Sequence, residues 1–67
     1  MTAQRNHRMP VYEWAWYEGV EYFCIPNLEE SRQQGRTMMD LCYCATAAMN
    51  GLVEKTVPFD PERLVVR

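Results

Sequence analysis

The sequence predicts a small α+β domain in which an antiparallel sheet, with the order strand, strand, strand, helix, strand, carries one helix on one face. Three observations predict it: two aromatic runs separated by a turn, a stripe of apolar residues at helical spacing, and a short apolar run near the end. The 67 residues allow one domain. A chain of this size buries only roughly 60% of the surface of its unfolded form, so we expect a homodimer or higher homo-oligomer.

A β-hairpin is predicted first. Residues 11–17 read VYEWAWY, and β-branched and aromatic residues favour a half-buried strand. Side chains alternate along a strand, so Trp14 and Trp16 share one aromatic face with Tyr12. Glu18 and Gly19 predict a tight turn, because glycine adopts positive φ without steric cost, and residues 20–25 form the second strand.

A helix is predicted in the second half. Pro26 ends the second strand because it cannot donate to the sheet ladder, and residues 28–35 are expected to form a polar connection with at most a short third strand near residues 32–34. Thr37 is expected to begin the helix, with Asp40 completing a capping box. The core face of the helix is predicted from spacing to contain Met38, Leu41, Cys42, Ala45, Ala48, Met49 and Leu52.

The two ends of the chain differ in character. Residues 1–9 are mostly polar and show no periodicity, which predicts a flexible N-terminal arm. Pro58 and Pro61 prevent a regular helix, so the segment before residue 64 is expected to be an extended connector. Residues 64–66 are apolar and are expected to add a last strand to the same sheet, which makes residues 10–67 a single domain.

Composition and charge exclude several classes of function. A hydrophobic content of 48% is too high for a disordered segment, and a net charge of -2 offers no cationic footprint for direct nucleic-acid binding. No apolar segment approaches the roughly 20 residues that span a bilayer, and no signal-peptide pattern is present. Three cysteines are an odd number and fit a reducing compartment, so we expect a cytoplasmic protein without membrane association.

Two patterns could carry chemistry, and each has a simpler explanation. On the predicted helix Cys42 and Cys44 point about 200° apart and cannot bind one ion, so we expect these thiols and Cys24 to be packing residues. His7, the only histidine, lies in the polar arm without a partner for acid–base catalysis. We therefore predict a protein that is not an enzyme and has no metal or cofactor. The alternative of a metal-binding or redox module using the three cysteines is left open.

The stretch EYFCIPNLEESRQQGRTMMDLCYCATAAM contains proline, glycine and threonine at characteristic positions. It resembles the HicB-type antitoxin family: residues 26–28 stand at the family's Pro-Asp-Leu, Gln34, Gly35 and Thr37 stand at its Gln, Gly and Thr, and residues 40–48 fall on its helix. The similarity covers residues 10–66, which would form a HicB-like domain. Residues 29–31 depart from the family's Pro-Gly-Cys. Since the sequence ends at Arg67, we expect no appended DNA-binding unit.

The resemblance implies a partial ribonuclease-H-like (RNase H-like) fold without ribonuclease H chemistry, and an antitoxin in a toxin-antitoxin system. Its partner would be a small basic HicA-type toxin, an mRNA interferase whose surface the antitoxin blocks. Residues 9–31 contain five glutamates and no base, which suits a basic partner. The candidate partner-binding residues are Trp14, Trp16, Glu18, Glu21, Glu30 and Tyr43.

Two other interpretations of the aromatic hairpin are left open. One is an orphan homo-oligomeric protein-interaction domain of the same fold with no toxin partner, which associates through edge strands and exposed aromatic residues. The other is that one aromatic face packs beneath the helix while the opposite face is ordinary amphipathic surface.

Overall fold

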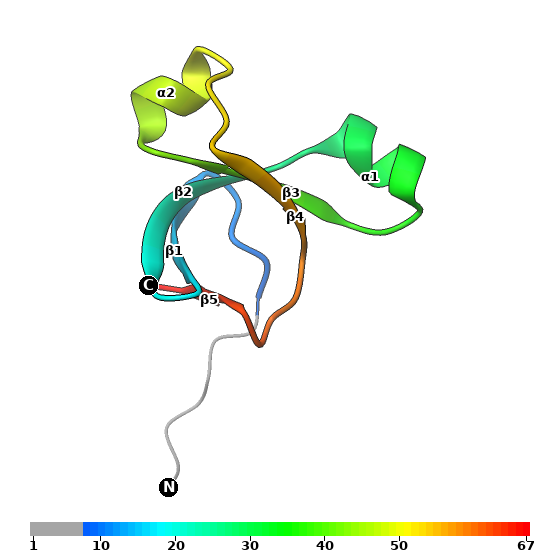
Figure 1. Cartoon of the computed structure of the whole chain (residues 1–67), viewed down its shortest axis with the longest axis horizontal. Coiled ribbons are helices and arrows are strands. Elements are labelled where there is room, and N and C mark those ends of the chain that lie inside the picture. The colour runs from blue at the N-terminus through cyan, green and yellow to red at the C-terminus, as the bar shows by residue number, and fades with distance from the viewer. Residues whose placement is uncertain (1–7) are drawn as a thin grey trace, which may run out of the picture.

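A computed structural model describes residues 8–67 and shows a five-stranded antiparallel sheet curled into a half-barrel, with two short helices outside the curl (Figure 1). His7 and most of the predicted arm lie outside the described residues. The strands have the spatial order β4-β3-β2-β1-β5. In chain order the elements are β1 (Glu13–Tyr17), β2 (Val20–Pro26), α1 (Leu28–Gln34), β3 (Met38–Cys42), α2 (Ala45–Met49), β4 (Lys55–Pro58) and β5 (Leu64–Val66).

The predicted α+β class and the hairpin of β1 and β2 are confirmed. Glu18 and Gly19 have φ values of 50° and 84°, the two positive values that a tight turn matching the twist of the strands requires. Strand β1 begins at Glu13 rather than at residue 11, because Tyr12 has a left-handed φ of 55°. The predicted last strand is also confirmed, since β5 pairs with β1.

The predicted polar connection after β2 is wrong, because these residues form α1. Asn27 begins this helix: its Oδ1 accepts a hydrogen bond from the Glu30 N–H at 2.9 Å. Gly35 ends the helix with a φ of 70° and donates its N–H to the Ser31 carbonyl at 2.9 Å. No strand forms near residues 32–34, so the third strand of the sheet begins later in the chain.

The predicted helix beginning at Thr37 is also wrong, because the segment after it is the central strand β3. This strand pairs with β2 and β4. Met39 and Leu41 face the inside of the curl and are fully buried, while Met38 and Cys42 are buried on the other face. A strand covered on both faces reads as a continuous apolar run, which sequence spacing alone cannot distinguish from a helix.

The helix predicted in this region is limited to α2, which has five residues and none of them buried. Of the predicted core face, Ala45, Ala48 and Met49 lie on α2, and Leu52 follows it with 62% of its surface exposed. The predicted extended connector contains the strand β4. The element order is therefore strand, strand, helix, strand, helix, strand, strand, and both helices lie on the convex face (Figure 1).

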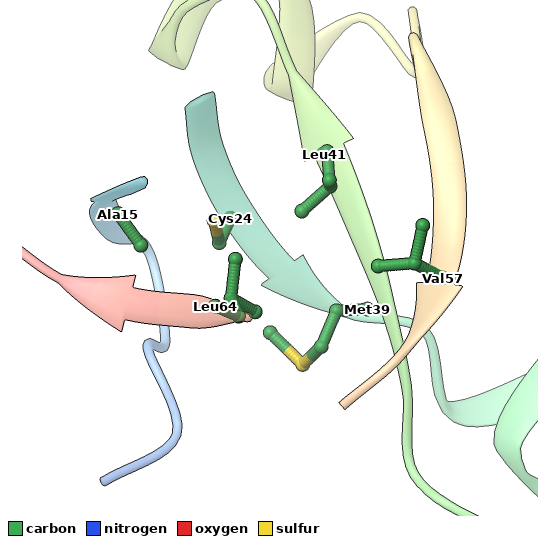
Figure 2. Packing of buried hydrophobic residues seen from close by; sticks show 6 residues of the cluster. All are labelled: Ala15, Cys24, Met39, Leu41, Val57 and Leu64. Carbon is green, nitrogen blue, oxygen red and sulfur yellow. The ribbon is translucent and has the colours of Figure 1, made fainter. Parts of the chain in front are cut away.

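The core lies inside the curl of the sheet rather than beneath a helix. Figure 2 shows six buried side chains, contributed by all five strands, that point toward one another: Ala15, Cys24, Met39, Leu41, Val57 and Leu64. Met9 and Phe59 pack against this cluster. None of the helices in residues 8–67 has the length and apolar character needed to cross a bilayer.

Candidate functional site

The convex face carries an apolar groove between α2 and β2. Its volume is about 390 Å³, and no residue that lines it is charged. Met49 and Tyr12 at its rim are 86% and 68% exposed, so the groove opens to solvent. The lining residues are Tyr12, Phe23, Ile25, Ala45, Ala48 and Met49.

Local structure explains why the groove forms here. Phe23 and Ile25 flank the buried Cys24 in β2, so they point to the convex face. Helix α2 begins at Cys44, whose Sγ accepts a hydrogen bond from the Ala47 N–H at 3.5 Å. Because α2 presents mainly alanine side chains to this face, space is left between the helix and the strand.

Tyr12 occupies a strained position at the rim of the groove. A bulky residue at a φ of 55° is uncommon and costs conformational energy. Its N–H donates to the Cys24 carbonyl at 2.9 Å, which holds this backbone segment against β2. The ring is thereby kept at the solvent-exposed rim of the groove.

The two predicted tryptophans extend this apolar surface along the sheet. Trp14 lies opposite Phe23 in the strand register, and the two rings make an edge-to-face contact with centroids 5.6 Å apart. Trp16 follows on the same face and is 45% exposed. We call the groove residues together with Trp14 and Trp16 the convex apolar surface.

The predicted acidic character of the hairpin is largely balanced by arginines from the two ends of the chain. Arg67 Nε lies 2.9 Å from Glu21 Oε2, and its guanidinium group lies 5.9 Å from the centroid of the Trp14 ring. Three of the five glutamates in residues 9–31 have such partners: Glu13 with Arg8, Glu18 with Arg63, and Glu21 with Arg67. Counting charges within residues 9–31 missed these pairs, because Arg8 directly precedes that window and the fold brings Arg63 and Arg67 from the other end of the chain.

The structure brings only some of the predicted partner-binding residues together. Trp14, Trp16 and Glu21 are neighbours, since Trp16 pairs with Glu21, and Glu18 lies at the turn of the same hairpin. Glu30 lies on α1, which among the described helices and strands contacts only β3, and accepts a hydrogen bond from Gln34 Nε2 at 2.9 Å. Tyr43 is exposed between β3 and α2 and does not line the groove.

The cysteines occupy separate environments. Cys24 is buried on the concave face, and burial raises the pKa of its thiol to about 11. Cys42 is buried on the opposite face, and burial raises its pKa too. Cys44 is partly exposed at the start of α2. Within the described residues, no group of three or more histidine, cysteine, aspartate or glutamate side chains could hold a metal ion.

Sequence reasoning identified the tryptophans but missed the groove. Sequence spacing predicts Ala45, Ala48 and Met49 on a core face, whereas the three residues line an open surface. Helix α2 has only five residues, little more than one helical turn. A helix this short cannot bury a continuous row of apolar side chains. Comparisons with protein-family models, curated proteins and solved structures find no match for this chain.

Proposed function

We propose that this chain is a non-enzymatic, cytoplasmic protein-interaction domain that self-associates through its convex apolar surface. The observation that carries the proposal is the solvent-open groove of about 390 Å³ with no charged lining residue. A contiguous exposed apolar surface of this kind marks an interaction site more often than ordinary protein surface. The three unpaired thiols fit a reducing compartment.

A second copy of the chain is the occupant that the charge pattern favours. In a two-fold symmetric interface the same surface meets itself, so like charges on it would face one another. The groove avoids this repulsion because its lining is uncharged. Met49 is the most exposed rim residue, and its flexible side chain can enter the groove of the other copy. Ala45 and Ala48 allow the two backbones to approach closely.

The sheet edges offer less for association than the convex apolar surface. Along an antiparallel pair, the N–H groups of successive residues point alternately toward the partner strand and toward the open edge. At β4 the Phe59 N–H points toward β3, where it donates to the Thr37 carbonyl, so the residues one and three positions before it face the open edge. Thr56 therefore directs its N–H to the open edge, while Pro58 has none.

At β5 the Arg67 N–H donates to the Trp14 carbonyl, so Leu64 and Val66 direct their N–H groups to the open edge. The Leu64 N–H already donates to the Asp60 carbonyl at 2.8 Å, which leaves Val66 as the free donor. Edges with so few free donors are poor templates for strand addition.

The test is the oligomeric state of two matched variants. Sedimentation equilibrium should show a dimer for the wild-type chain, and Met49→Asp should weaken the dimer at least about tenfold by placing a charge in the interface. Leu28→Asp is the control, because Leu28 is 75% exposed on α1 and lies outside the convex apolar surface. Circular dichroism checks that both variants fold. A wild-type monomer at about 1 mM, or equal effects of both variants, would overturn the proposal.

A second candidate function follows from the family resemblance: a HicB-like antitoxin of partial RNase H-like fold that neutralises a small basic HicA-type ribonuclease toxin. The resemblance implies a helix that begins at Thr37, but the residues after Thr37 form strand β3, so this part of the chain does not support the antitoxin candidate. Support comes instead from helix α1. There Leu28 is exposed beside Glu29 and Glu30, and no arginine or lysine in the described part of the chain forms an ion pair with them. This acidic and apolar corner suits a cationic partner.

Co-expression tests the antitoxin candidate separately from self-association. A small basic ribonuclease encoded next to this chain should copurify with it and lose its toxicity. The double variant Glu29→Lys and Glu30→Lys should reverse both effects, whereas Met49→Asp should preserve both. Absence of capture and of relief from toxicity would exclude this candidate.

A further inference from the structure

A lysine lies over two tyrosine rings at one end of the concave face. The Nζ atom of Lys55 is 5.9 Å from the ring centroid of Tyr17 and 5.9 Å from that of Tyr22. Both rings belong to the concave face, because Tyr22 pairs with the buried Ala15 and Tyr17 follows Ala15 by two residues. Both also pack against the core cluster, which holds them in place.

Lys55 reaches this position from the other side of the half-barrel. It belongs to the edge strand β4, which two strands separate from β1 in the sheet. In the described part of the chain no ion pair joins Lys55 to a carboxylate. The tyrosine faces are therefore the main attraction shown for its ammonium group. One cation shared by two aromatic faces is the arrangement by which proteins bind ammonium ligands.

We propose that Tyr17 and Tyr22 form a binding site for a trimethylammonium group, such as that of trimethyllysine or choline, and that Lys55 fills this site in the free chain. The primary ammonium of lysine is strongly hydrated and holds an exposed aromatic contact weakly. A trimethylammonium group presents methyl groups to the rings and is less costly to remove from water. It should therefore displace Lys55, whose side chain regains conformational freedom on release.

The surrounding charges permit a cationic ligand. Glu18 and Arg63 lie at the same end of the hairpin, and their side chains pair at 3.7 Å, so the arginine charge is partly balanced. The chain as a whole carries a net charge of -2. This site lies on the face opposite the convex apolar surface, so the inference does not depend on the proposed self-association.

Titration with tetramethylammonium chloride, followed by NMR of the tyrosine rings against equal concentrations of sodium chloride, tests the site. Binding should shift the Tyr17 and Tyr22 ring signals. Lys55→Ala should tighten binding at least about threefold by removing the internal competitor, while Lys55→Arg should resemble the wild-type chain. The neutral choline analogue 3,3-dimethyl-1-butanol should bind far more weakly than choline, because the attraction requires a positive charge.

Tyrosine variants and a monomeric variant complete the test. Tyr22→Leu removes the aromatic ring and should abolish binding. Tyr22→Phe keeps the aromatic face and should retain binding. Met49→Asp should bind as the wild-type chain does, whether or not the wild type dimerises. Separate titrations with trimethyllysine and with choline distinguish a peptide source from a small-molecule source. Equal binding of the neutral analogue, or no gain in Lys55→Ala, would overturn the proposal.

Discussion

The two faces of the sheet differ in what covers them. On the concave face the chain covers itself: the side chains of Ala15, Cys24 and Leu41 are fully buried inside the curl. On the convex face the two helices cover only part of the sheet, and α2 contributes no buried residue. Within residues 8–67 the chain forms its core by bending the sheet, and the two short helices leave part of the convex face uncovered.

The largest difference between the faces should appear in stability. Leu41→Ala removes a fully buried side chain from the concave cluster and should lower the free energy of unfolding by about 2–5 kcal/mol. Leu52→Ala, next to the exposed helix on the convex side, should change it by no more than about 0.5 kcal/mol. Urea denaturation measures both values. Val57→Ala, a smaller deletion in the same cluster, replaces Leu41→Ala if that variant does not fold, and equal losses at the two positions would contradict the comparison.

Thiol alkylation should be about two orders of magnitude slower at Cys24, on the concave face, than at Cys44, at the start of α2. Because burial raises the pKa of Cys24 to about 11, only about one molecule in a thousand carries this thiolate at pH 8. Cys44 is partly exposed and should react first with iodoacetamide. Cys42 should follow, because local opening of the short helix α2 exposes it, and Cys24 should react last. Mass spectrometry of labelled peptides gives the order, and similar rates for Cys24 and Cys44 would show that the concave core is open.

The smallest effect should come from the ion pair at the edge of the concave face. A hydrogen bond from Arg8 lowers the pKa of Glu13, so the folded state favours the carboxylate. This contribution is present above the usual glutamate pKa of about 4.3 and is lost as the pH falls through the lower folded value. Glu13→Gln should slightly lower the urea midpoint at pH 7 and leave it unchanged near pH 2. Glu54→Gln is the control, and a difference that persists in acid would contradict the assignment.

Local signals explain which elements could be predicted. The hairpin was predicted because a glycine turn between two aromatic runs specifies it without help from the rest of the chain. Helix α1 also had local signals, an N-cap at Asn27 and a C-terminal glycine at Gly35, but its lack of an apolar stripe concealed it. For β3 the local signals favoured a helix, because Thr37 and Asp40 are residues typical of the start of a helix. Instead Asp40 accepts hydrogen bonds from Asn27 Nδ2 at 3.0 Å and Thr56 Oγ1 at 2.7 Å.

The candidate site was likewise only partly predictable from the sequence. Alternation along β1 was enough to place Trp14 and Trp16 on one face. The groove could not be predicted, because it exists only where α2 lies over Phe23 and Ile25. The charge balance of the hairpin was hidden in part, since Glu18 and Glu21 find their partners, Arg63 and Arg67, at the other end of the chain.

By itself the sequence determined the hairpin, the last strand and the placement of Trp14 and Trp16 on one face, because turn chemistry and strand alternation act between residues close together in the chain. Only the tertiary structure decided that residues 38–42 are a strand, that the core lies inside a curled sheet, and that Arg63 and Arg67 balance Glu18 and Glu21. These features depend on pairing between segments far apart in the chain. Such pairing outweighs the weak local preference for a helix.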